Sequence, residues 1–456
     1  MLSYLVHHLV SIATAVGTVL LALHLLSAST RRSSQSVLAW LLALVFLPPI
    51  TIPLYLLLGT RKLVRGAAPV PPDDADVDPR RRPIARVVTS TGLAPARVHN
   101  SFDVLGDGVA AYGRLLELVR DARRSIHLTV FILGDDPVGH AIVDALVERA
   151  RAGVRVRVLL DAVGSRPVLA RACAALRGAG GEARAFMPFW HHPLRGRNNL
   201  RSHRKLAIFD GARVFTGGMN LAVEYLGPTP SDERWRDLAA VAEGPIARDA
   251  EALFASDWRY AGGAEPEPIA DERLPPAGDA VLQLVPSGPD VVDDALADAL
   301  VAAIGAARER VIAVTPYYIP DDTLHRALEL AARRGVRTAL LMPARSNHAI
   351  ADFARRGLLA ELRDAGVELY AYTRGMVHAK AMAVDDDFAF VGSPNFDMRS
   401  LYLNYENAIF VHSERDVAKV AAYLEALRDE CEEGAFDLRP RPWLLEQLAR
   451  LVSPEL

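Results

Sequence analysis

The chain has 456 residues, of which 51% are hydrophobic, and a formal net charge of −3. This length exceeds one ordinary hydrophobic core and predicts two or more domains, and the high apolar content indicates membrane segments. The slightly negative charge excludes a global basic field for nucleic acid, and two distant cysteines exclude a disulfide framework or a cysteine zinc site.

The N-terminal residues predict a membrane anchor. Two apolar stretches, residues 9–26 and 37–58, approach the roughly 20 residues that cross a bilayer, and a short polar connector makes them a transmembrane helical hairpin. The segment before them lacks lysine and arginine, which argues against a cleaved signal peptide. Pro48, Pro49 and Pro53 leave a re-entrant second segment as the alternative. More positive charge follows the second stretch than lies in the connector, so we expect the rest of the chain in the cytoplasm.

The remainder of the chain repeats itself. Segments that begin at Ala122 and Ala307 both predict a buried apolar strand, an acidic turn, an amphipathic helix and a second apolar strand. Such alternation is typical of α/β layers, so we predict two homologous α/β domains. The predicted boundaries are a two-segment anchor at residues 1–65, a linker at 66–99, a first domain at 100–262, a linker at 263–277, and a second domain with a C-terminal helix at 278–456.

Each half continues into the same pattern, H-x-K-x4-D-x6-G-[GS]-x-N. One match would be a weak signal, but two matches at equivalent places in a repeat make chance implausible. The candidate residues are His203, Lys205, Asp210, Gly218 and Asn220 in the first half, and His378, Lys380, Asp385, Ser393 and Asn395 in the second.

The spacing of these residues suits phosphodiester chemistry. Residues two apart on a strand share a face, so each histidine projects beside its lysine. Lysine can hold phosphoryl oxygens, histidine can attack phosphorus or carry a proton, and the two asparagines can donate amide hydrogens to the same oxygens. The glycine and serine positions let the backbone approach the substrate closely. Asp210 and Asp385 are expected to anchor the turn after the strand rather than to transfer protons.

The lysines are unusual because the chain otherwise uses arginine almost exclusively. Lysine occurs only at Lys62, Lys205, Lys380 and Lys419, and two of these lie in the repeated motif. We therefore predict that the motif requires a compact ammonium group rather than a planar guanidinium.

From residue 100 onward, the duplicated motif resembles the phospholipase D superfamily. The resemblance implies two domains packed about a pseudo-twofold axis, with both motifs in one site. One histidine would form a phosphohistidine and the other would exchange protons with the alcohols, without a metal or cofactor. A downstream acid would orient the histidine of each motif, and Asp237 and Glu406 occupy the matching positions. We expect His203 to be the nucleophile, because Arg201 on the same strand face would keep its imidazole neutral.

Finer features resemble the bacterial cardiolipin synthases. These features include the apolar N-terminus and the segments LLDAVGS at residues 159–165 and NFDMRSLYLNYEN at 395–407. Ser202, Asn347 and residues 355–357 depart from the family pattern, so the resemblance leaves the choice of acceptor alcohol open.

The resemblance implies transfer of a phosphatidyl group between two phosphatidylglycerol molecules, which gives cardiolipin and glycerol. A phospholipase D-type hydrolase or a transferase with another acceptor alcohol is the alternative, and a phosphodiesterase or nuclease is less favoured. The implied partners are phospholipids and the membrane, not nucleic acid, and the implied location is the bacterial inner membrane, as a multi-pass protein. The oligomeric state stays open.

Overall fold

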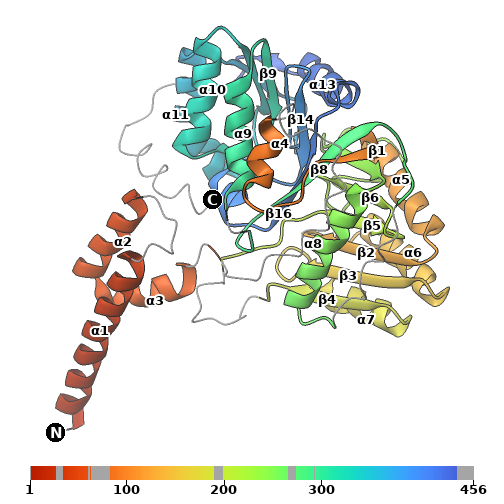
Figure 1. The fold of residues 1–456 in the computed structure, drawn as a ribbon. Coiled ribbons are helices and arrows are strands. Elements are labelled where there is room, and N and C mark those ends of the chain that lie inside the picture. Colours follow the sequence, from red (N-terminus) through yellow and green to blue (C-terminus); the bar gives the residue numbers. More distant parts are fainter. Residues whose placement is uncertain are drawn as a thin grey trace.

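The computed structural model describes residues 2–26, 34–59, 62, 83–188, 199–264, 274–291 and 293–438. Three helices open the chain and lie beside the main body, with the first projecting away from it (Figure 1). The bounds of these helices are α1 (Leu2–Leu26), α2 (Ser34–Phe46) and α3 (Pro48–Leu58). A small cluster that includes Leu25, Leu44 and Tyr55 holds them together.

The predicted transmembrane hairpin is not confirmed. The second apolar stretch is interrupted at Leu47, where α2 ends and α3 begins with two prolines. Proline lacks the N–H that would continue the preceding helix, so the stretch forms pieces of 13 and 11 residues. Within the described ranges, the structure contains no helix that is long and apolar enough to cross a membrane.

The body is built on one long sheet, with equivalent elements in its two halves. A short helix, α4 (Pro83–Thr89), lies in the range that we expected to be a linker and packs on α9. The elements of the first half are β1 (Arg97–Leu105), α5 (Gly108–Asp121), β2 (Ser125–Val130), α6 (Pro137–Arg151), β3 (Arg155–Asp161), α7 (Leu169–Gly178), β4 (Glu182–Phe186), β5 (Leu206–Phe209), β6 (Arg213–Gly217), β7 (Ala239–Glu243) and α8 (Ile246–Tyr260).

The second half repeats this order and adds a short two-stranded ladder, β10 with β15. The predicted C-terminal helix lies outside the described residues. The elements of the second half are β8 (Ala280–Ser287), α9 (Ala295–Ala306), β9 (Arg310–Val314), β10 (Tyr318–Ile319), α10 (Asp322–Arg333), β11 (Arg337–Pro343), α11 (Ala349–Asp364), β12 (Glu368–Tyr372), β13 (Ala381–Val384), β14 (Phe388–Gly392), β15 (Phe396–Asp397), α12 (Met398–Tyr402), β16 (Glu406–Val411), α13 (Glu414–Asp429) and β17 (Glu432–Glu433).

The two halves meet where β1 pairs antiparallel with β8 at the centre of the sheet. Outward from this pair, the strand order is β7-β6-β5-β2-β3-β4 on one side and β16-β14-β13-β9-β11-β12 on the other, where β17 adds one more strand at the edge. The same order read in opposite directions is a pseudo-twofold arrangement, with its axis between β1 and β8. The prediction of two repeated α/β domains is confirmed.

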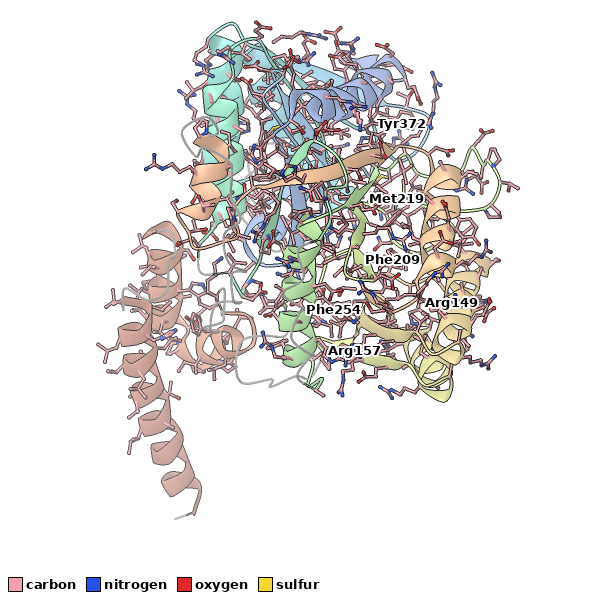
Figure 2. All side chains as sticks on the ribbon, turned by 45° about the vertical axis from the view of Figure 1, so that its right-hand side comes forward. Arg149, Arg157, Phe209, Met219, Phe254 and Tyr372 are labelled. Atoms are coloured by element: carbon pink, nitrogen blue, oxygen red, sulfur yellow. The ribbon has the colours of Figure 1, made fainter. Side chains whose placement is uncertain are left out.

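Helices cover both faces of the sheet. The helices α8 and α13 lie on one face, where a single core runs through both halves, whereas α5, α6 and α7 cover the other face of the first half. Figure 2 shows Phe254 on α8 and Arg149 on the opposite layer. Asp136 and Asp321, in the two predicted acidic turns, cap α6 and α10 by accepting hydrogen bonds from backbone N–H groups.

Candidate active site

Both histidines lie where one half of the chain contacts the other. The backbone N–H of His203 donates to the carbonyl of Tyr405 over 2.8 Å, and that of His378 donates to the carbonyl of Arg236 over 2.7 Å. Each motif therefore runs alongside the segment that carries the other half's candidate acid. The two contacts are equivalent under the pseudo-twofold arrangement.

The histidine and carboxylate pairs are crossed between the halves. Glu406 lies 2.9 Å from Nδ1 of His203, and Asp237 lies 2.7 Å from Nδ1 of His378. The expectation that each acid orients the histidine of its own motif is wrong. Each motif pairs with the neighbouring segment of the opposite half, so the acid of that half is the one within reach.

Burial dominates the ionisation of these groups. It lowers the pKa of His203 to about 4 and the pKa of His378 to about 3, against the opposing pull of the two carboxylates. Burial alone would raise the pKa of Asp237 and Glu406, but the adjacent imidazoles and lysines hold both below their ordinary values. The site therefore contains neutral imidazoles hydrogen-bonded to ionised carboxylates. Because the carboxylates engage Nδ1, Nε2 is the ring nitrogen left for the reaction, although at His378 it also has the ammonium of Lys380 beside it.

The two motif lysines are buried close to both imidazoles. Lys380 Nζ lies 3.0 Å from His378 Nε2, and Lys205 Nζ donates to the carbonyl of His203 over 2.9 Å. Burial lowers the pKa of Lys205 to about 8 and that of Lys380 to about 7, although carboxylates of both halves oppose the change. Each ammonium lowers the pKa of both histidines, so the four groups act on one another electrostatically.

The residue between the first histidine and lysine, just before β5 begins, forms ion pairs in the protein interior. Arg204 is fully buried and donates to Asp257 over 2.6 Å and to Asp290 over 3.0 Å. Asp257 lies on α8 and Asp290 follows β8, so the guanidinium joins the first motif to both halves. The sequence analysis did not single out Arg204, although its place inside the motif was a usable signal.

Asp210 and Asp385 lie outside the site and hold turns. The carboxylate of Asp210 accepts hydrogen bonds from the backbone N–H groups of residues 123–125, and that of Asp385 from residues 308–310. Both residues have positive φ, 56° and 47°. The expected anchoring role agrees with these contacts, and neither carboxylate lines the cavity described below.

Gly218 and Ser393, which we expected to contact substrate, support the carboxylates instead. A Cβ atom at Gly218 would lie 2.1 Å from Asp237 Oδ1, so only glycine leaves room for that carboxylate. Ser393 Oγ donates to Glu406 Oε2 over 2.5 Å. The equivalent positions thus serve the two acids in different ways.

One cavity of about 440 Å³ joins the two halves of the site. It is lined by both histidines and by Asn220 and Asn395, so four of the predicted residues share one space, whereas the two lysines lie behind its lining. Sequence analysis missed much of the wall. The missed residues include Phe131, whose ring lies 5.2 Å from that of His203, and Tyr225 and Trp235, whose rings lie 5.0 and 5.5 Å from that of His378.

The two motif asparagines make different contacts. Asn220 Oδ1 accepts a hydrogen bond from the backbone N–H of Ile132 over 3.2 Å. Asn395 Nδ2 donates to Asp397 over 2.9 Å and to Ser400 over 3.2 Å. The amide hydrogens of Asn395, expected to point at phosphoryl oxygens, are engaged by these neighbours.

Arg201 lines the cavity, as alternation predicted, but it does not distinguish the histidines. Its guanidinium donates to the carbonyl of Met187 over 2.6 Å. The cations that lower the pKa of His203 are Lys205 and Lys380, and His378 has a cationic neighbour of its own. The electrostatic reason for assigning the nucleophile to His203 is therefore wrong. In the described part of the chain, no cluster of three or more histidine, cysteine or acidic side chains is arranged to hold a metal ion.

A duplicated α/β fold whose halves share one site of paired imidazoles and ammonium groups defines an enzyme of the phospholipase D class. The family model described as "Cardiolipin synthase, PLD-like domain" matches residues 115–258 and 300–428, and the model "Phospholipase_D-nuclease N-terminal" matches residues 16–59. The chain belongs to the cardiolipin synthase family.

Known proteins agree with this assignment over most of the chain. The cardiolipin synthase of Geobacillus kaustophilus is 31% identical over 98% of this chain and 94% of its own length. The major cardiolipin synthase ClsA of Bacillus subtilis is 32% identical over 93% of this chain and 95% of its own length. The crystal structure of phosphatidylserine synthase from Haemophilus influenzae matches 82% of this chain and all of its own with a TM-score of 0.63 at 14% identity, which shows a shared fold.

Proposed function

We propose that this protein is a cardiolipin synthase that transfers a phosphatidyl group from one phosphatidylglycerol to another and releases glycerol. The observation that carries the proposal is the pair of neutral imidazoles, one from each half, that line one cavity with Nδ1 held by a carboxylate of the opposite half. Relatives that are called cardiolipin synthases extend over nearly the whole chain and support this substrate class.

The reaction proceeds in two displacements at phosphorus. The anionic phosphate of the bound donor raises the pKa of the imidazoles beside it, so that one of them enters the reaction as imidazolium. Nε2 of the neutral histidine attacks the donor phosphorus, the bond from phosphorus to the glycerol oxygen breaks, and that oxygen takes the Nε2 proton of the imidazolium. The acceptor's hydroxyl then returns a proton to the second histidine, attacks the phosphohistidine and releases the first imidazole. The carboxylates of Asp237 and Glu406 stabilise each imidazole when it becomes charged.

Charge on the phosphoryl group is balanced by Lys205 and Lys380, which lie behind the imidazoles. Their ammonium groups stabilise the negative charge that accumulates on the non-bridging oxygens when phosphorus becomes five-coordinate. No step of this sequence requires a metal ion or nucleotide. Asp210 and Asp385 contribute only by fixing the turns that follow the motif strands.

Two other reactions use the same groups. Attack of water or another alcohol on the phosphohistidine gives a phospholipase D-type hydrolase or a different phosphatidyltransferase. A phosphodiesterase that acts on nucleic acid is disfavoured, because the net charge of −3 offers no field to collect a polyanion.

We further propose that the N-terminal helices attach the protein to the inner membrane of a bacterium, with the catalytic body in the cytoplasm. Large apolar side chains on or between α2 and α3 are exposed, among them Val45 at 69%, Phe46 at 75% and Ile50 at 62%. Exposed apolar surface of this kind favours a lipid environment over water. Resistance of the protein to extraction from membranes by carbonate tests this proposal, and release into the supernatant contradicts it.

The decisive experiment incubates the purified protein in vesicles of defined lipid composition and identifies the products. Phosphatidylglycerol alone should give cardiolipin and free glycerol in equal amounts, and phosphatidic acid as the sole product would contradict the proposal. Donor lipid labelled in the phosphate should leave label on only one of the variants His203→Ala and His378→Ala, because only one histidine attacks phosphorus. Absence of label from both would contradict the phosphohistidine route.

A further inference from the structure

The two halves of the cavity wall differ, although the backbone that carries them is duplicated. Trp235 and Asn404 occupy equivalent positions, two residues before the crossed carboxylates, and both line the cavity. Ala222 and Asp397 are also equivalent, two residues after the motif asparagines, and only Asp397 lines the cavity. At these two pairs of positions, the first half therefore presents an indole to the cavity, whereas the second half presents an amide and a carboxylate.

The polar wall carries hydrogen-bond acceptors that the protein leaves without donors. Asn395 and Asn404 are 6% and 8% exposed, and among the described residues nothing donates to the Oδ1 atom of either amide. Asp397 lies beside them, 5% exposed, and burial raises the pKa of its carboxyl group. A buried hydrogen-bond acceptor requires a hydrogen-bond donor. In a cavity this donor comes from solvent or from a ligand that carries hydroxyl groups.

Two arginines adjoin these acceptors. Arg201 and Arg399 line the same cavity. Burial is the main cause that lowers the pKa of Arg201, and the positive charge of Arg399 lowers it further, so the two guanidinium groups act on one another. The guanidinium of Arg201 donates to the carbonyl of Met187, and that of Arg399 donates to the carbonyl of Asn199. Both groups are positively charged, and a guanidinium has five N–H donors, so Arg399 offers an anion further donors besides the one that bonds to Asn199.

We propose that this polar wall of Arg201, Asn395, Asp397, Arg399 and Asn404 binds the headgroup of the acceptor lipid. The amide and carboxylate oxygens accept hydrogen bonds from the glycerol hydroxyls of this second lipid. The guanidinium of Arg399 binds the phosphate of the same lipid, and the charge of Arg201 attracts that phosphate. The acceptor phosphatidylglycerol carries both features on one headgroup, whereas water and ethanol carry neither phosphate nor a second hydroxyl. The wall thus directs the phosphohistidine towards a second lipid instead of water. This inference rests on the proposed function.

The test measures how the intermediate is divided between acceptors. Full-length protein is incubated with vesicles of phosphatidylglycerol and phosphatidylcholine that contain ethanol, and cardiolipin is measured against phosphatidic acid plus phosphatidylethanol. Arg399→Ala and Asn404→Leu should each lower this ratio about tenfold, because each removes one charged or buried hydrogen bond to the acceptor. Arg399→Lys should recover part of the loss. Arg345→Ala, which removes an exposed charge outside the cavity lining, should keep the wild-type ratio.

The outcomes separate this inference from the function on which it rests. If the wild type forms cardiolipin but Asn404→Leu and Arg399→Ala keep its ratio, the wall does not select the acceptor. A parallel fall of all products would show a structural role and would also overturn the inference. If Arg399→Ala fails to fold, Asn404→Leu, which replaces the amide by an apolar group of similar size, decides alone. Wild-type protein that forms no cardiolipin would instead overturn the proposed function.

Discussion

The carboxylate of Glu406 lies 2.9 Å from Nδ1 of His203, and the two residues belong to different halves of the chain. Asp237 and His378 make the reciprocal contact. Each half therefore supplies one imidazole and the acid for the other imidazole, and neither half contains a complete pair. The pairing follows from the way each motif lies against the opposite half, and it governs how substitutions should act.

Glu406→Gln should perturb His203 and leave His378 unchanged, and Asp237→Asn should do the reverse. Loss of the carboxylate removes the group that fixes the tautomer and stabilises the imidazolium, so each variant should lose about 10⁴-fold in kcat. Histidine-labelled protein observed by nitrogen NMR should show the affected ring directly. A change at His378 on Glu406→Gln would contradict the crossed pairing.

Lys205→Arg and Lys380→Arg should each lose most of the activity while the fold is kept. The lysines are 4% and 0% exposed, so a larger planar guanidinium would displace the adjacent imidazole from its position for attack. Activity and circular dichroism should be measured on the same preparations. The matched control is Lys419→Arg, because Lys419 lies outside the site and pairs with Asp416. This variant should behave as wild type. Normal turnover in both motif variants would show that charge alone suffices.

Activity should fall as the pH rises above about 7, because burial lowers the pKa of Lys380 to about 7 and that of Lys205 to about 8. Each loses the positive charge that the transferred phosphoryl group needs. The same two lysines change the stability of the fold in the opposite direction to the activity. In the unfolded chain a lysine has a pKa of about 10.4. Between the lowered pKa of the folded state and this value, the unfolded state binds more protons, so the free energy of unfolding rises with pH.

Profiles of kcat/KM and of thermal unfolding, taken over the same range of pH, separate these effects. Falling activity with an unchanged or rising midpoint temperature is the expected result. Activity that keeps rising to pH 9 would contradict the role assigned to the lysines.

Arg204→Met should lower the free energy of unfolding by about 3–5 kcal/mol, because it leaves Asp257 and Asp290 without their buried partner. Denaturant unfolding of the purified protein measures the change. Arg363→Met removes an exposed arginine that pairs with Asp364 and should leave stability nearly unchanged. An equal effect of the two substitutions would show that the buried ion pairs of Arg204 do not stabilise the fold.

Activity should survive chelators, because the proposed chemistry assigns every role to protein side chains. Protein treated with a chelator should keep its rate of cardiolipin formation. Several divalent ions should then be added separately, since ions also screen lipid headgroups. Loss of activity that one particular ion restores would contradict the prediction.

The duplicated organisation could be predicted because it rests on local signals. His203 and Lys205 lie close together as their spacing predicted, although both precede β5 instead of lying on a strand, and aspartates at the acidic turns cap α6 and α10 as such residues ordinarily do. The break before Pro48 is also a local signal, because proline lacks the N–H that would continue the preceding helix, whatever the apolar content of the stretch.

The crossed pairing could not be predicted, because it depends on contacts between residues far apart in the chain. Nothing near Asp237 indicates that the segment before it runs beside His378 rather than His203. The polar and aromatic walls were missed for the same reason. Trp235 and Asn404 carry no motif of their own, and they become comparable only when the two halves are superposed on the pseudo-twofold axis.

The antiparallel pairing of β1 with β8 makes this single chain equivalent to a symmetric dimer fused end to end. In a true homodimer, one substitution changes both copies at once, so the two sides of the site must stay identical. Fusion removes that constraint, and one copy can specialise while the other keeps its inherited surface. An indole at position 235, where the equivalent position 404 carries an amide, is a divergence that a homodimer of one half could not accumulate.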